Sequence, residues 1–210
     1  MTRKALIYKI LIQIYGGPPT DDRDISDDLV NVWVNEGVAL AAKQNYKEAI
    51  QIDGMGYINN SFYATYSGLS IISDTTDNLC YKLTLPQLPL GIGRNEGVAT
   101  LKFKDSNGFV SLTGIPLSIN QQAYADNMPV IPNKIMYWPE GNTLRMKSAL
   151  QLWNYTGIVK MVSAGDSTDL HSTLLVPDDY IPVVTDYVSK MLLLQRSQPV
   201  DTTNDGLDKS

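Results

Sequence analysis

The stretch NYKEAIQIDGMGYINNSFYATYSGLSII, residues 45–72, separates two kinds of sequence. Up to Gly54 the apolar residues recur at helical spacing, and residues 45–54 either extend a helix or form a short new one that ends near Gly54. After Gly54 the apolar runs are short, rich in β-branched and aromatic residues, and bounded by Gly, Pro, Asn and Asp. This change predicts helices at the N-terminus, followed in the sequence by a β-domain.

Several segments of the second region read as strands. They cover residues 61–72, 78–85, 97–105, 108–115, 134–147 and 157–164. Ser106-Asn107-Gly108 and Pro139-Glu140-Gly141-Asn142 predict hairpin turns, because Asn and Gly accept the positive φ of tight turns. Strands spaced roughly ten residues apart are typical of a small antiparallel sandwich or barrel.

Residues 4–15 predict a first helix that is apolar on two faces. Gly16-Gly17-Pro18-Pro19 ends it, since proline cannot continue a helix. Tyr8 and Ile12 lie opposite the main apolar face, and a second subunit packed there would explain them. The main face consists of Leu6, Ile7, Ile10, Leu11 and Ile14.

Residues 27–45 predict a second helix with Ser26 as its N-cap. Gly37 in mid-helix costs about 1 kcal/mol relative to Ala, so we expect it to permit a close helix–helix approach, most simply against the first helix. The expected buried face consists of Leu29, Val30, Trp33, Gly37, Leu40 and Gln44.

A third helix is predicted from Asp178 to about Ser197, with Val184, Val188, Met191 and Leu192 on one face beside Ile181. The predicted fold class is α+β, a small helical bundle with an inserted antiparallel β-sandwich or barrel. The predicted domains are residues 1–54 for the N-terminal helices, 55–170 for the β-domain, 171–197 for the helix that completes the bundle, and 198–210 for a polar tail.

The composition of the 210 residues is that of an ordinary globular chain, and its net charge is -5. This charge argues against a protein that coats nucleic acid, which needs a basic stripe to displace counterions. The single cysteine, Cys80, cannot form an internal disulfide and favours a reducing compartment. No apolar run reaches the roughly 18 residues of a membrane span, so we expect neither membrane association nor a signal peptide.

The acidic run from Asp21 to Asp28 alternates oxygen-bearing side chains as a calcium loop does. An EF-hand needs glycine at loop position 6 and glutamate at position 12, where this chain has Asp27 and Trp33, so we expect no metal. Asp27 and Asp28 suit the positive end of a helix dipole. Asp21, Asp22 and Asp24 exceed what capping requires, and they are expected either to be solvated or to contact a basic partner.

No catalytic signature surrounds the candidate nucleophiles. Cys80 and His171 are the only cysteine and histidine, and neither lies in an activating motif. GIGRNEG, residues 91–97, departs from the dinucleotide fingerprint in spacing and context, so a loop is expected there. We therefore expect no enzyme and no cofactor.

Three stretches carry a resemblance to a known family. ISDDLVNVWVNEGVALAAKQNY (25–46), LTLPQLPLGIGRNEGVATLKF (83–103) and LLVPDDYIPVVTDYVSKMLLLQRSQPVDTTNDG (174–206) resemble head-to-tail connector proteins of tailed bacteriophages, most closely those of crAss-like podoviruses. The resemblance implies a structural virion protein at the head–tail junction, made in the host cytoplasm. It also implies a ring, usually a dodecamer, that contacts the portal and neighbouring tail or ring proteins while DNA passes through its channel.

Interface residues are expected on the third helix and the tail of such a connector. They are Leu194, Gln195, Arg196, Pro199, Asp201, Asn204 and Asp205, beside Tyr8, Ile12 and the three aspartates of the acidic run. The alternative is a non-catalytic β-sandwich that binds a carbohydrate or a host receptor. That alternative requires a groove lined with tyrosine or tryptophan and open to solvent.

Overall fold

A computed structural model describes residues 1–17, 25–74, 80–92, 97–122, 124, 127, 129–131, 134–165 and 168–197. The chain divides into two compact units. The helical unit falls within Met1–Ala41, Asp166–Leu174 and Asp178–Ser210, and the barrel unit within Ala42–Gly165 and Leu175–Pro177. The sequence placed a boundary at residue 54, whereas the units divide inside the second helix.

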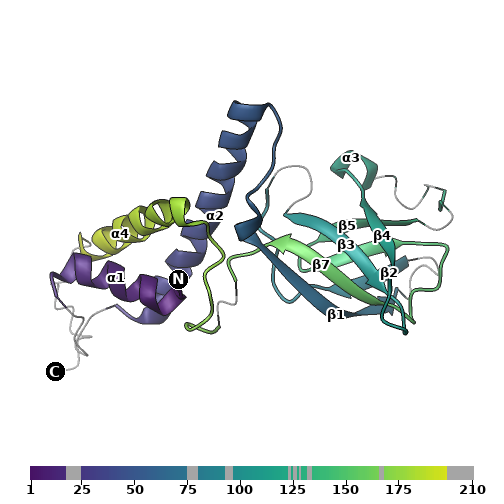
Figure 1. Ribbon diagram of the computed structural model, residues 1–210, viewed down its shortest axis with the longest axis horizontal. Coiled ribbons are helices and arrows are strands. Elements are labelled where there is room, and N and C mark those ends of the chain that lie inside the picture. Colours follow the sequence, from purple (N-terminus) through teal and green to yellow (C-terminus); the bar gives the residue numbers. More distant parts are fainter. Residues whose placement is uncertain are drawn as a thin grey trace, which may run out of the picture. The chain divides into compact units, whose positions relative to one another are not determined.

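The helical unit is built from α1 (Arg3–Tyr15), the first half of α2 (Asp27–Asp53), the short η4 (Asp178–Tyr180) and α4 (Ile181–Ser197) (Figure 1). Thr2 caps α1 by accepting from the Ala5 amide, and Gly16 ends it at a φ of 70°. Ser26 caps α2 as expected, since its hydroxyl accepts from the Leu29 amide at 3.3 Å. The core consists of Leu6, Ile7, Ile10, Leu11, Val30, Trp33, Val34, Val38, Ala41, Val184, Val188 and Leu192.

The expected face of α2 is wrong in part. Leu29 is 37% exposed and Leu40 is 44% exposed, while Val34, Val38 and Ala41 are fully buried. Val30, Trp33 and Gly37 are buried as expected, whereas Gln44 is exposed. Gly37 does permit a close approach, but its nearest neighbour is Val184 of α4, not the first helix.

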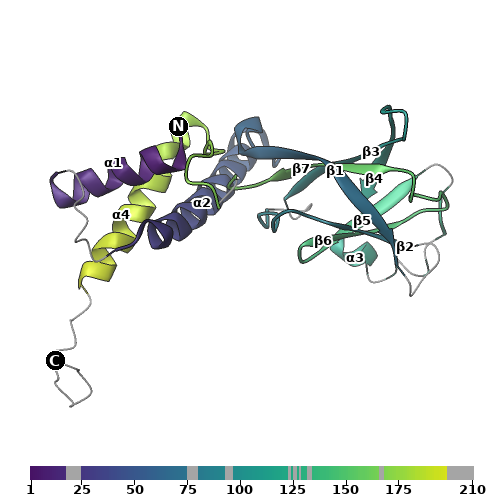
Figure 2. The ribbon, with the colours of Figure 1, turned by 90° about the horizontal axis from the view of Figure 1, so that it is seen from below.

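The barrel unit contains a closed seven-stranded barrel within the described residues, so the barrel alternative of the predicted fold class is the one that forms. Figure 1 and Figure 2 show the strands from two sides. The order around the barrel is β1-β2-β6-β5-β4-β3-β7. The strands are β1 (Tyr63–Ser73), β2 (Cys80–Thr84), β3 (Val98–Lys104), β4 (Val110–Pro116), β5 (Ile135–Glu140), β6 (Thr143–Lys147) and β7 (Thr156–Val162).

One strand pair departs from the expected antiparallel pattern. β4 and β5 run parallel, with Gly114 opposite Ile135. Parallel neighbours need a crossover of about a dozen residues, and the segment between β4 and β5, which contains the short helix α3 (Ile119–Gln122), supplies it. All other neighbours in the barrel are antiparallel.

Alternating side chains fill the barrel. The core includes Leu83, Leu101, Phe103, Ile135, Tyr137, Leu144, Met146, Val159 and Met161. Both predicted hairpins form, between β3 and β4 and between β5 and β6, and their turns contain Gly108 and Gly141 at positive φ. The pairing of β1 with β7 closes the barrel across about a hundred residues of sequence, because Thr65 lies opposite Lys160.

Candidate interface surfaces

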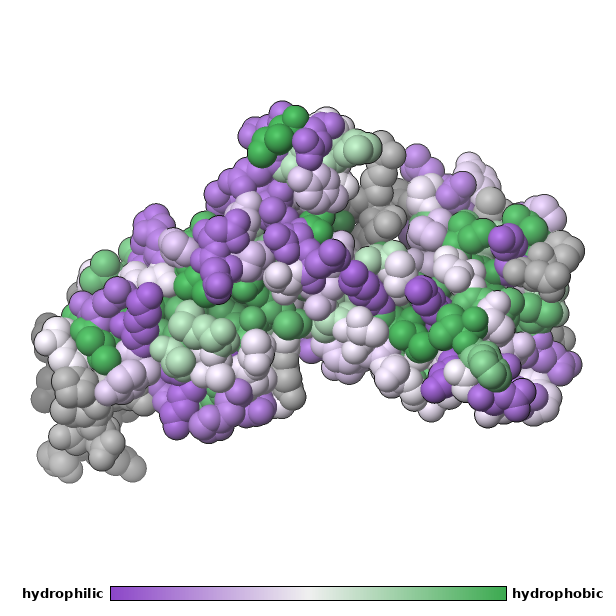
Figure 3. Space-filling view, in the orientation of Figure 1, coloured by the Kyte–Doolittle hydropathy of each residue, from purple (hydrophilic) through white to green (hydrophobic). Residues whose placement is uncertain are grey.

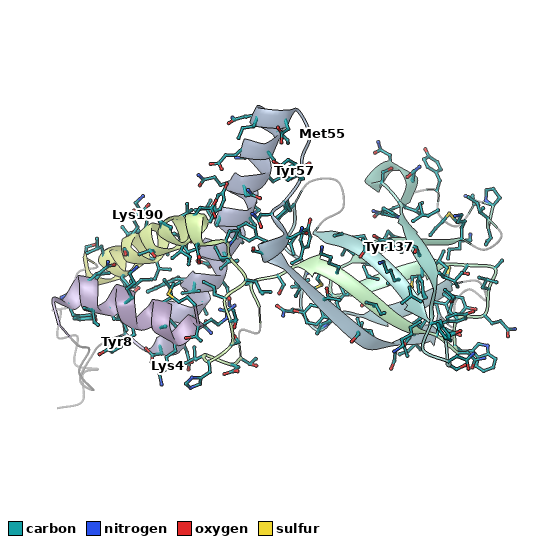
Figure 4. All side chains as sticks on the ribbon, viewed as in Figure 1. Lys4, Tyr8, Met55, Tyr57, Tyr137 and Lys190 are labelled. Atoms are coloured by element: carbon teal, nitrogen blue, oxygen red, sulfur yellow. The ribbon has the colours of Figure 1, made fainter. Side chains whose placement is uncertain are left out.

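The outer face of α1 carries the first pair of predicted interface residues. Tyr8 is 49% exposed and Ile12 is half-buried. Lys4 lies one turn before Tyr8, and both side chains point away from α1 in Figure 4. The inner face of the helix is already buried, so these residues form a second face that the helical unit does not cover.

A similar outer stripe lies on α2. Leu29, Val32 and Leu40 are 37%, 51% and 44% exposed. Glu36 lies between them, and one of its carboxylate oxygens accepts a hydrogen bond from the Tyr187 hydroxyl at 2.9 Å. This hydrogen bond is the main reason why the pKa of Tyr187 is raised above its ordinary value.

The end of α4 presents another apolar surface. Leu193 and Leu194 are 57% and 61% exposed, and they line a shallow hollow together with Lys190 and Ser197. Gln195 is exposed as well. Arg196 turns back onto its own unit, where its guanidinium lies 4.9 Å from the centre of the Tyr15 ring.

Asp21, Asp22, Asp24, Pro199, Asp201, Asn204 and Asp205 lie outside the described residues. The structure thus places Tyr8 and Ile12 on α1 and Leu194, Gln195 and Arg196 on α4, on separate helices of one unit.

The barrel unit holds a pocket of about 240 Å³ at one end of the barrel. This is the end where β1 and β3 begin and β7 ends, because Tyr63, Val98 and Val162 line the pocket. Three tyrosine rings face it from three segments. The lining consists of Tyr46, Gly56, Tyr57, Ile58, Tyr63, Ile92, Gly97, Val98, Ala99 and Val162.

The tyrosines are held by specific contacts. A Cβ at Gly56 would collide with the Tyr46 ring, so any larger residue there would have to displace that ring. The Lys160 ammonium lies 4.7 Å from the centre of the Tyr63 ring, where a cation is attracted to the ring face. A hydrogen bond to the Asp53 carboxylate raises the pKa of Tyr57, and burial raises the pKa of Tyr63.

A buried polar cluster fastens the segment that brings Ile92 to the pocket. Ser163 is 1% exposed and donates to the Gln87 side-chain oxygen at 3.0 Å. The Gln87 amide in turn donates to the Tyr66 hydroxyl. The Leu90 amide also donates to the Val162 carbonyl at 3.2 Å, so residues 85–92 are tied to the barrel at several points.

Large apolar side chains project from the opposite end of the barrel. This end is marked by Lys104 and Ser70, which both lie opposite Thr156. The exposed side chains are Ile72 at 62%, Phe109 at 73%, Val110 at 53% and Trp153 at 64%. Figure 3 shows hydrophobic surface over the barrel unit and at the tip of α2, interrupted by hydrophilic residues.

The two units differ in charge. Counted on the sequence, the segments of the helical unit carry 14 Asp and Glu against 7 Lys and Arg, and those of the barrel unit carry 8 against 10. The net charge of -5 therefore comes from the helical segments.

The two candidate nucleophiles belong to different units. Cys80 is buried at the start of β2 in the barrel unit, and His171 is exposed in the helical unit, where its amide donates to the Asp169 carboxylate at 2.8 Å. Among the described residues, no group of three or more His, Cys, Asp or Glu is arranged to hold a metal ion. None of the described helices combines the length and apolar character that a bilayer crossing requires.

Sequence reasoning missed the pocket and the projecting aromatic residues. Tyr46, Tyr57 and Tyr63 lie close together in sequence, but a tyrosine cluster does not reveal that β7 will complete a pocket around them. Phe109 directly follows the predicted Asn107-Gly108 turn. A side chain at that position could have been expected to project from the hairpin. No protein-family model and no curated protein matches this chain.

Proposed function

We propose that this protein is a subunit of the ring that connects the head of a tailed bacteriophage to its tail. The observation that carries the proposal is that α1, α2 and α4 each keep exposed apolar residues outside the helical core. Tyr8, Val32 and Leu194 are each about half exposed on helices whose other faces already form a core. Exposed apolar side chains on the outer sides of all three helices favour contacts with other proteins, and neighbouring subunits would cover them.

The charge distribution supports the same role. The helical segments carry an excess of seven acidic residues, and a channel lined by acidic residues lets DNA pass without adhering. Asp21, Asp22 and Asp24 belong to this excess. Replacing all three with asparagine tests whether they contact a basic neighbour, since a contact predicts weaker assembly and a purely solvated loop predicts no change.

The experiment that tests the proposal is assembly of the purified chain. Negative-stain microscopy and light scattering are carried out on the protein alone and after mixing with a portal ring. We expect closed rings in at least one of the two conditions. A monomer that also fails to bind the portal ring would contradict the proposal.

A second candidate function is a carbohydrate-binding barrel, which the tyrosine-lined pocket favours. Tyr57 is 52% exposed at the pocket, and an exposed aromatic ring can stack on a sugar. A glycan array with the purified chain tests it, with Tyr57→Ala as the variant that should lose binding. Tyr124→Ala is the matched control, because Tyr124 is 67% exposed and does not line the pocket.

A further inference from the structure

We infer that the tyrosine-lined pocket receives Phe109 from a second copy of this chain, so that copies join end to end through their barrels. The inference deepens the proposed ring function and rests on it. It names the contact that would join one subunit to the next.

Phe109 is an unusual phenylalanine in this chain. It is 73% exposed, whereas Phe62 and Phe103, the other two, are fully buried. At the same end of the barrel Ile72, Val110 and Trp153 are also more than half exposed, and a group of exposed apolar side chains favours a partner that covers it.

The turn that carries Phe109 is held rigid. The Phe109 amide donates to the Asp105 carboxylate at 2.9 Å, and the Asn107 amide donates to the same oxygen at 3.0 Å. The Asp105 amide donates to the Phe109 carbonyl at 3.0 Å. A side chain presented on such a turn loses little conformational freedom on binding, which favours association.

The pocket has the size and chemistry for one phenyl ring. Its volume is about 240 Å³, and an apolar protein cavity of about 150 Å³ is known to hold benzene. The described lining offers three tyrosine rings with their hydroxyls, together with aliphatic side chains. A phenyl ring packs favourably against tyrosine rings in offset or edge-to-face arrangements.

The barrel places the pocket and the projecting ring at opposite ends. Val98 of β3 lies opposite Met161, near the pocket, and Lys104 of β3 lies opposite Thr156, beside the turn that bears Phe109. Phe109 therefore cannot fill the pocket of its own barrel. A contact between two different patches is heterologous, and repeated heterologous contacts close into a ring when the rotation between copies allows it.

Substitution at the two ends tests the inference. Phe109→Ser should weaken self-association at least tenfold, and Ala99→Trp, which fills the pocket, should weaken it to a similar extent. Tyr124→Ser removes an aromatic ring of comparable exposure and should leave association unchanged. Circular dichroism confirms that each variant is folded before association is measured by light scattering.

Cross-linking tests whether the Phe109 turn of a second copy occupies the tyrosine-lined pocket. In a Cys80→Ala background, Ser106→Cys, an exposed position in the turn that keeps Phe109 intact, is combined with Ile58→Cys and treated with a short bismaleimide. We expect a ladder of covalent multimers that rises by one chain per step, whereas each single-cysteine variant stops at a dimer or gives no product. Absence of the ladder, or glycan binding that Tyr57→Ala abolishes, overturns the inference.

The two proposals fail in different ways. Closed rings that persist in Phe109→Ser and give no ladder would leave the connector function standing and overturn the Phe109 contact. A ladder from open filaments, with no closed ring alone or on a portal, would support the contact and contradict the ring function.

Discussion

The guanidinium of Arg3 is buried against α2, where its Nη1 donates to Asn31 at 2.8 Å and to Asn35 at 2.7 Å. Arg3 is fully buried, although it is the first residue of α1. Its amide also donates to the Ser172 carbonyl at 3.2 Å. This residue therefore fastens the start of the chain to two other segments of the helical unit.

Arg3→Met should lower the free energy of unfolding by about 2 kcal/mol, because a buried amide oxygen left without its donor costs roughly 1–3 kcal/mol. Lys4→Met is the matched control, since Lys4 is exposed and its loss should change stability by less than about 0.5 kcal/mol. Urea unfolding followed by circular dichroism measures both. Equal effects of the two substitutions would contradict a specific role for the Arg3 hydrogen bonds.

The Tyr137 hydroxyl lies inside the barrel without a hydrogen-bond partner among the described residues (Figure 4). Removing an unsatisfied buried hydroxyl relieves its desolvation cost, so Tyr137→Phe should raise the free energy of unfolding by about 1 kcal/mol. Thermal unfolding at neutral pH measures the change. Tyr8→Phe, at an exposed position, should leave the melting temperature unchanged.

The same burial makes stability depend on alkaline pH. Burial raises the pKa of Tyr137 from 10.0 to about 12, so between these values the unfolded chain releases the proton more readily than the folded one. Ionisation of Tyr137 therefore does not affect the free energy of unfolding below pH 10. As pH rises from 10 towards 12, the free energy of unfolding falls by about 1.4 kcal/mol per pH unit. Tyr137→Phe should flatten this part of the stability curve, and a slope as steep as that of the parent protein would contradict the assignment.

Local signals predict most of the secondary structure. Ser26 marks the start of α2 because a serine oxygen can accept from the free amides of a helix start. The Asn107-Gly108 pair marks the hairpin between β3 and β4 because glycine adopts the φ of 89° found there. These features depend on neighbouring residues alone, so the sequence reveals them.

Long-range packing is where sequence reasoning fails. The buried face of α2 depends on which neighbours approach, and small residues such as Val38 and Ala41 lie inside because α4 comes close to Gly37. The pocket needs Tyr46 and Val162, which are more than a hundred residues apart in the sequence. Neither arrangement has a local signature, because both follow from how the segments meet in space.

The close approach of α2 and α4 predicts a penalty for any side chain at Gly37. A Cβ there would lie 3.0 Å from Val184 Cγ1 and 3.3 Å from Val184 Cα. Gly37→Ala gains about 1 kcal/mol of helix propensity but must displace α4, so we expect a net loss of about 1 kcal/mol, and a loss of about 3 kcal/mol for Gly37→Leu. Chemical denaturation measures both, and the loss for alanine should shrink in a Val184→Ala background. A stabilised Gly37→Leu variant would contradict the tight contact.

Substitutions at three successive leucines of α4 distinguish a residue that stabilises the fold from residues of the proposed subunit interface. Leu192 is fully buried, whereas Leu193 and Leu194 are 57% and 61% exposed. Leu192→Ser should lower the free energy of unfolding by about 3 kcal/mol, because it empties a core position and buries a hydroxyl.

Leu193→Ser and Leu194→Ser, made together, should change stability by less than about 0.5 kcal/mol per residue and should weaken ring formation, because they remove apolar surface that a neighbouring subunit would cover. Chemical denaturation gives the first quantity, and light scattering with negative-stain microscopy gives the second. A double variant that assembles like the parent protein would remove the end of α4 from the proposed subunit interface. The apolar stripe on α2, tested next by Val32→Ser, would then be the leading helical contact.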